Sequence, residues 1–170
     1  MFFSFSIDGT DPHDHPQVRI KIPVVYKSTP TGSDFTGNYN IRIYRARFNF
    51  AGLKLTEEAK RLQEPARVKV TLRHSGTETV VDVKNSAHLF THDGIQTMYS
   101  FHLYPDGTIK AQDNGNIGGV DVDERETTFA APGPFADYWE VDLNGTQFNH
   151  LDFKKVTDAY FDFCGTNYAW

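Results

Sequence analysis

The residues best suited to hold a metal ion lie in the segment 11–16, which reads Asp-Pro-His-Asp-His-Pro. On an extended chain alternate side chains point to the same side, so His13 and His15 would present two imidazoles together. Such pairs bind zinc, copper or iron, but the site also needs a third and a fourth ligand. The other histidines are scattered and offer no second spaced motif. The segment therefore predicts either an exposed loop between prolines or a transition-metal site at His13 and His15.

A second pair of histidines, His88 and His92, is spaced four residues apart and precedes Asp93-Gly94. On a helix the two rings would share a face. The flanking sequence favours the end of a strand instead, so the pair is interpreted as structural.

Oxygen ligands gather in the glycine-bearing stretch 113–126, where Asp113, Asp121 and Asp123 are the candidate calcium ligands. Calcium takes about 6–8 oxygen ligands, and the stretch lacks the twelve-residue spacing of an EF-hand loop. Asp121 and Asp123 alternate with valines, which is also typical of the solvent face of a strand. Both interpretations remain open from the sequence.

Aromatic residues make up 14% of the chain, more than alternating strands are expected to bury. Exposed aromatic rings stack on sugars or build interfaces. Basic side chains add an anion-binding hypothesis. They alternate with apolar residues on several predicted strands, and on neighbouring strands they would form one cationic face. These residues are Arg19, Lys21, Arg45, Arg47, Arg67, Lys69 and Arg73. The candidate ligand-binding residues are Tyr39, Tyr104, Tyr138, Trp170, Arg45 and Arg47.

The sequence contains no motif of an activated nucleophile or of a phosphate loop. Cys164 follows Phe163 in an apolar stretch and is interpreted as a small core residue. Acid–base pairs formed by residues distant in sequence are not excluded, so enzymatic activity stays uncertain, and we favour a protein without it.

Period-two alternation of apolar residues is the main structural signal. It predicts strands at 18–24, 39–50, 67–74, 78–83, 96–104, 108–112, 138–143, 148–153 and 159–164. Within 39–50 the apolar parity changes near Tyr44-Arg45, which predicts either an exchange of buried faces or a β-bulge. One short helix is expected at 56–63, because Thr56 can cap it, acids follow, and Pro65 stops it.

Many short strands without long helices favour a single all-β domain spanning residues 1–170. We predict an antiparallel β-sandwich of jelly-roll kind with one short helix; a closed β-barrel is the alternative.

Charge and processing signals narrow the function classes. The net charge is −5, which makes nucleic-acid binding unlikely. Residues 1–75 carry a net +5 and residues 76–170 a net −10, an asymmetry that could drive self-association. One cysteine excludes an internal disulfide, and no apolar run is long enough to span a membrane. The first residues do not read as a signal peptide, so we expect a cytoplasmic location, with non-conventional export as the alternative.

These observations lead to three functional hypotheses. The first is a non-catalytic binding module, most plausibly for a glycan. The alternative is a small β-barrel or cupin-like enzyme that uses a metal near His13 and His15. The second alternative is a structural subunit of a homo-oligomeric assembly. No cofactor is assigned beyond a possible calcium or transition-metal ion.

Overall fold

The computed structural model describes residues 18–22, 24, 38–112, 117, 131–144 and 148–168. One α-helix, α1 (Glu57–Arg61), and two short 3₁₀ turns, η3 (Phe148–His150) and η4 (Phe153–Lys155), accompany the strands of this part. The strands are β1 (Val18–Ile22), β2 (Tyr39–Ala51), β3 (Lys54–Leu55), β4 (Ala66–His74), β5 (Thr77–Val81), β6 (Ala87–Thr91), β7 (Ile95–Leu103), β8 (Ile109–Ala111), β9 (Trp139–Asn144), β10 (Leu151–Asp152) and β11 (Asp158–Tyr168).

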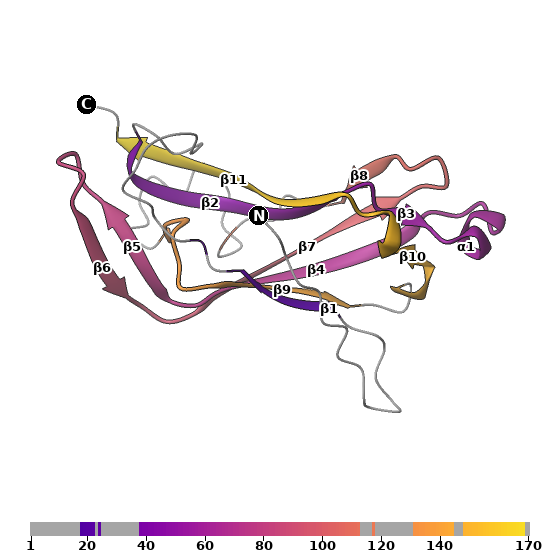
Figure 1. Cartoon of the computed structure of the whole chain (residues 1–170), viewed down its shortest axis with the longest axis horizontal. Coiled ribbons are helices and arrows are strands. Elements are labelled where there is room, and N and C mark those ends of the chain that lie inside the picture. Colours follow the sequence, from indigo (N-terminus) through magenta and orange to yellow (C-terminus); the bar gives the residue numbers. More distant parts are fainter. Residues whose placement is uncertain are drawn as a thin grey trace.

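Two antiparallel layers face each other across an apolar interior. One layer is a five-stranded sheet in the order β1-β9-β4-β7-β8, and the other is the long two-stranded ribbon of β2 and β11. In Figure 1 the ribbon runs along one side of the molecule, with β4, β7 and β9 beneath it. None of the described sheets closes into a barrel. The predicted all-β, sandwich-like fold is thus confirmed.

The alternation read from the sequence decides which face each strand buries. In β4, Val68, Val70 and Leu72 are buried, whereas Arg67 and Lys69 are exposed. The neighbouring strand β9 buries Trp139, Val141 and Leu143. Since successive side chains of a strand point to opposite faces, each of these strands supplies one apolar face to the same core.

The parity change in β2 is a β-bulge. Cys164 pairs with Arg45 and the next residue, Gly165, pairs with Ile43, so Tyr44 has no partner in the register of β11. Ile43 and Ala46 are consequently both buried. A Cβ atom on Gly165 would lie 2.3 Å from the backbone oxygen of Arg42, so the bulge requires a glycine there.

The predicted helix is present but short. The Thr56 hydroxyl accepts a hydrogen bond from the backbone N–H of Ala59, as an N-cap does. Among the described residues no helix is long and apolar enough to cross a membrane.

The segment predicted as a strand at 148–153 differs from the prediction. It consists mainly of the turns η3 and η4, with the two-residue strand β10 between them. The strand β6 was not among the predicted strand ranges, although the sequence around His88 and His92 favoured a strand end there; all five of its residues are exposed.

Tyr99 joins the two layers by polar contacts within the apolar core. Its side chain comes from β7, and its hydroxyl bonds to the backbone of Phe48 in β2, accepting from N–H at 2.7 Å and donating to C=O at 2.5 Å. Both bonds are buried. Because a buried backbone group without a partner is costly, one hydroxyl stabilises the packing of the ribbon on the sheet.

We expect Tyr99→Phe to lower the free energy of unfolding by about 1–3 kcal/mol, because it leaves two buried backbone groups of Phe48 without this partner. Urea unfolding followed by tryptophan fluorescence measures the change. Tyr160→Phe is the matched control, since Tyr160 is 52% exposed. Equal stability of the two variants would contradict this role of the Tyr99 hydroxyl.

Candidate functional site

The β5–β6 hairpin is an excursion from the five-stranded sheet. β4 and β7 are hydrogen-bonded neighbours, and His74 at the end of β4 lies opposite Ile95 at the start of β7. Between these residues the chain leaves the sheet, forms the hairpin and returns. In Figure 1 the hairpin projects at the end of the molecule opposite α1. Residues just before and just after the hairpin therefore meet at its base.

A glycine turn brings the two arms of this base together. Gly76 has φ +86°, and its carbonyl accepts a hydrogen bond of 2.7 Å from the backbone N–H of His92. A Cβ atom at position 76 would lie 2.3 Å from the His92 carbonyl oxygen. Only glycine fits both the conformation and the close approach.

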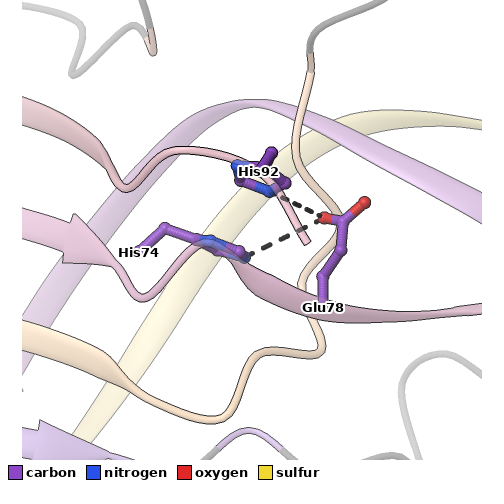
Figure 2. A group of neighbouring side chains, drawn as sticks. All are labelled: His74, Glu78 and His92. Carbon is purple, nitrogen blue, oxygen red and sulfur yellow. Dashed lines mark ion pairs between the residues drawn. The ribbon is translucent and has the colours of Figure 1, made fainter. Parts of the chain in front are cut away.

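Three side chains with metal-ligating atoms converge at the hairpin base (Figure 2). The Nε2 atom of His74 is 4.0 Å from Oε2 of Glu78, and Nε2 of His92 is 3.7 Å from the same oxygen. Their ligand atoms all lie within 4.8 Å of one another. The side chains of His74 and Glu78 are 0% and 2% exposed, whereas His92 is 31% exposed and forms the solvent side of the cluster.

The Glu78 carboxylate is buried but has two other partners. Nη1 of Arg42, on β2, donates to Oε1 at 2.7 Å. The backbone N–H of Gly133 donates to Oε2. Gly133 belongs to the crossing segment 131–138, which bonds to β2 through Ile43 and to β5 through Thr79. The carboxylate of β5 is thus held in place by two other parts of the chain, β2 and the crossing segment.

Backbone hydrogen bonds define the protonation of the two rings. Nδ1 of His74 accepts a bond of 3.0 Å from the N–H of Gly76, so a neutral His74 carries its proton on Nε2. Nδ1 of His92 lies 2.6 Å from the carbonyl oxygen of Asp93 and must donate to it, which leaves the Nε2 lone pair of a neutral His92 available. Neither Nε2 atom has a hydrogen-bond partner among the described residues.

The surroundings of His74 keep its ring neutral. Burial is the main reason that the pKa of His74 is lowered from 6.5 to about 4; Glu78 and the Gly133 backbone oppose the shift, and His92 contributes to it. The ring also stacks on His92, with centroids 5.1 Å apart, and meets the edge of Trp139 at 4.9 Å. A ring in this environment is fixed in orientation and uncharged over the neutral pH range.

Two imidazoles and a carboxylate form a donor set that suits zinc. Zinc binds nitrogen and oxygen ligands at about 2.0–2.2 Å, which places tetrahedral ligand atoms about 3.3–3.5 Å apart. The two separations from Oε2, 4.0 Å and 3.7 Å, would have to shorten by about 0.2–0.7 Å to reach that spacing. Rotation of the partly exposed His92 can shorten the separation of 3.7 Å, whereas the separation of 4.0 Å shortens only if the buried His74 ring or the Glu78 carboxylate moves.

The described ligand candidates from the sequence do not form one site. Tyr39 is the first residue of β2 and pairs with Tyr168 of β11. Tyr104 directly follows β7 and precedes β8, which lies at the opposite end of the molecule (Figure 1). Tyr138 precedes β9 and, like the other two tyrosines, is half-buried. Outside the described residues lie His13, His15, Asp113, Asp121, Asp123 and Trp170.

The predicted cationic face is divided between the layers. Arg45 and Arg47 lie on the ribbon strand β2, where Nη2 of Arg45 donates to Sγ of Cys164 at 2.5 Å. The other basic residues lie on β1 and β4, which both flank β9. Arg73 on β4 pairs with Glu140 and Asp142 of β9. Acidic residues therefore interrupt the basic rows of the five-stranded sheet.

Two members of the histidine–glutamate cluster, His74 and Glu78, were not identified from the sequence. His92 appeared only in the pair with His88, which instead bonds to Asp82 at 3.0 Å. The signal in the sequence is His74 before the turn Ser75-Gly76 and Glu78 after it, together with His92 just after β6. A hairpin inserted between paired strands brings these positions together, but the pairing of β4 with β7 is not apparent from local alternation.

The low pKa of His74 predicts an acid-sensitive fold in chelator-treated protein. The unfolded chain binds this proton below pH 6.5, and the folded chain binds it only near pH 4. Stability should therefore fall as the pH is lowered from 6.5 to 4, by on the order of 3 kcal/mol from this group, with no further loss below that window. Urea unfolding across this range measures it, and His74→Gln should flatten the profile. A ring-proton NMR titration of His74 with a midpoint near 6.5 would contradict the prediction.

Comparisons with protein-family models, curated proteins and solved structures found no match to this chain, so its function is argued from its own residues.

Proposed function

We propose that this β-sandwich binds one divalent transition-metal ion, of which zinc fits the donor set, between His74, Glu78 and His92. The observation that carries the proposal is that two buried Nε2 atoms, neither with a hydrogen-bond partner among the described residues, face the same carboxylate oxygen. Buried polar atoms are ordinarily paired, so such a cluster needs a further partner.

Contacts outside the cluster support a ligand role for two of its members. Metal-bound histidines usually donate their other ring N–H to a carbonyl or carboxylate, as His92 does to Asp93. Glu78 can coordinate through Oε2 while Oε1 keeps its bond to Arg42. These two side chains are already oriented as ligands before any ion binds.

Two features oppose binding and set the expected affinity. His74 must move its proton to Nδ1, which removes the acceptor of the Gly76 N–H, at a cost of about 1–3 kcal/mol. Arg42 already compensates the Glu78 charge, so the ion meets a nearly neutral pair. Zinc-finger peptides with four ligands bind zinc with about 10–16 kcal/mol. A three-ligand site with these costs is expected to bind zinc with a dissociation constant of about 1 μM.

The ligands belong to both arms of the hairpin, which suggests a structural role for the ion. His74 precedes the hairpin, Glu78 lies on β5, and His92 follows β6. An ion held by all three would fasten the hairpin base to the sheet. The glycan, enzyme and assembly hypotheses stay predictions, since no described residue tests them.

Zinc titration of the chelator-stripped protein, by calorimetry or competition with a chromophoric chelator, tests the proposal. We expect one zinc ion per chain, and a zinc affinity about 100-fold lower or more in His92→Ala. Removing a residue that only supports a ligand typically lowers metal affinity about 10–100-fold, and removing a ligand itself should lower it further. His88→Ala is the matched control, since His88 lies on the same hairpin but pairs with Asp82.

A second control addresses the competing segment. The double variant His13→Ala/His15→Ala should bind zinc as the unchanged protein does. If this variant loses the ion while His92→Ala keeps it, the metal belongs to the segment 11–16, and the proposal is wrong. Equal affinity of His92→Ala and His88→Ala would also refute it.

A further inference from the structure

A shallow depression lies on the β2–β11 ribbon, at the end where β2 begins and β11 finishes. Its volume is about 180 Å³. Ile41, Ile43 and Phe163 provide an apolar surface, and Gly165 contributes backbone only. The polar lining consists of Asn38, Thr166 and Asn167.

Among the described residues the lining contains no ionisable side chain, which restricts the ligand. Arg42 lies between two lining residues in sequence, but its guanidinium bonds to Asn40, Glu78 and Ala131 instead. A phosphate or carboxylate would therefore meet no cation from the lining. A purely aliphatic ligand would leave the amides and the hydroxyl facing apolar atoms, which is costly.

Irregular backbone shapes this end of the ribbon. The Tyr44 bulge lies on one side, and a second register shift between Thr166 and Tyr168 lies on the other. Asn40 has φ +44°, a conformation that is uncommon for residues other than glycine. Bulges re-aim side chains and occur often beside binding sites. At this end of the ribbon the irregular backbone brings Asn38 and Asn167 together, and the Asn167 amide donates a hydrogen bond to Oδ1 of Asn38.

The size and chemistry of the depression match one six-membered ring. An apolar cavity of about 150 Å³ binds benzene, so about 180 Å³ accommodates a ring of that size. A neutral pyranose has apolar C–H faces suited to an aromatic ring, and hydroxyls that amides and a hydroxyl can bind. Phe163 is half-buried and provides the aromatic ring. Its ring already stacks on Phe161, with centroids 5.0 Å apart, and lies 5.5 Å from Trp139, so a sugar would meet only the part of the ring that lines the depression.

We propose that this depression binds one neutral pyranose unit, with the ring over Phe163 and its hydroxyls toward Thr166, Asn167 and Asn38. The inference is independent of the metal site, because no residue is shared between the two. It also assigns glycan recognition to residues other than the tyrosines singled out in the sequence.

Saturation-transfer NMR and calorimetry, in the presence of a chelator, test this site with the methyl glycosides of glucose, galactose, mannose and N-acetylglucosamine. Glucuronic acid and glucose 6-phosphate serve as anionic comparators. At least one neutral sugar should bind with a dissociation constant of about 1 mM, as expected for a single ring in an open site. The anionic sugars should bind more weakly.

Two variants localise the binding. Asn167→Ala and Thr166→Val should each weaken the bound sugar about tenfold, the effect of losing a hydrogen bond. Both side chains are exposed, so the fold should tolerate the changes. Asn149→Ala, at an exposed asparagine on η3, is the matched control and should bind normally.

The proposal is overturned if no neutral sugar binds up to about 50 mM, a concentration that would nearly saturate a millimolar site. It is equally overturned if both variants bind as the unchanged protein does. Loss of binding in Tyr104→Ala alone would assign recognition to the region beside β7 and β8 and would also refute it.

Discussion

A buried carboxylate is the constraint on which the arrangement of this end of the sandwich depends. Removing a charge from water costs several kcal/mol, and the cost is recovered only by close partners. For Glu78 these are the Arg42 guanidinium from β2 and the Gly133 N–H from the crossing segment 131–138. Because each partner belongs to a different part of the chain, satisfying one carboxylate fixes the hairpin, the ribbon and the crossing segment together.

The same constraint explains why two histidine rings gather there. With Arg42 balancing its charge, Glu78 offers Oε2 as an acceptor toward a space lined by His74 and His92. Burial disfavours the charged form of His74, so this ring is not simply a counter-ion of the carboxylate. The cluster is therefore better suited to coordinate a cation than to add a second ion pair.

Local alternation was enough to predict the layers but not the site. The apolar parity of 67–74 and 138–143 identified β4 and β9, and the parity change at Tyr44-Arg45 marked the place where the structure has a bulge, one of the two alternatives it allowed. These features depend on residues close in sequence. The pairing of β4 with β7 around an intervening hairpin depends on contacts distant in sequence, and it is this pairing that brings His92 to His74. Alternation also failed at 148–153, where side-chain parity does not distinguish a strand from 3₁₀ turns.

The hairpin itself shows why its base is the place where an ion would matter most. All five residues of β6 are exposed, so this strand gains little from apolar burial and depends on its pairing with β5. Val80 and Val81 of β5 are buried, and they anchor one arm only. The other arm is attached to the body near the His92–Gly76 hydrogen bond. An ion shared by His74, Glu78 and His92 would attach that arm to the body a second time, at the point where the chain re-enters the sheet. One further bond at this point would restrict the motion of the whole β5–β6 hairpin.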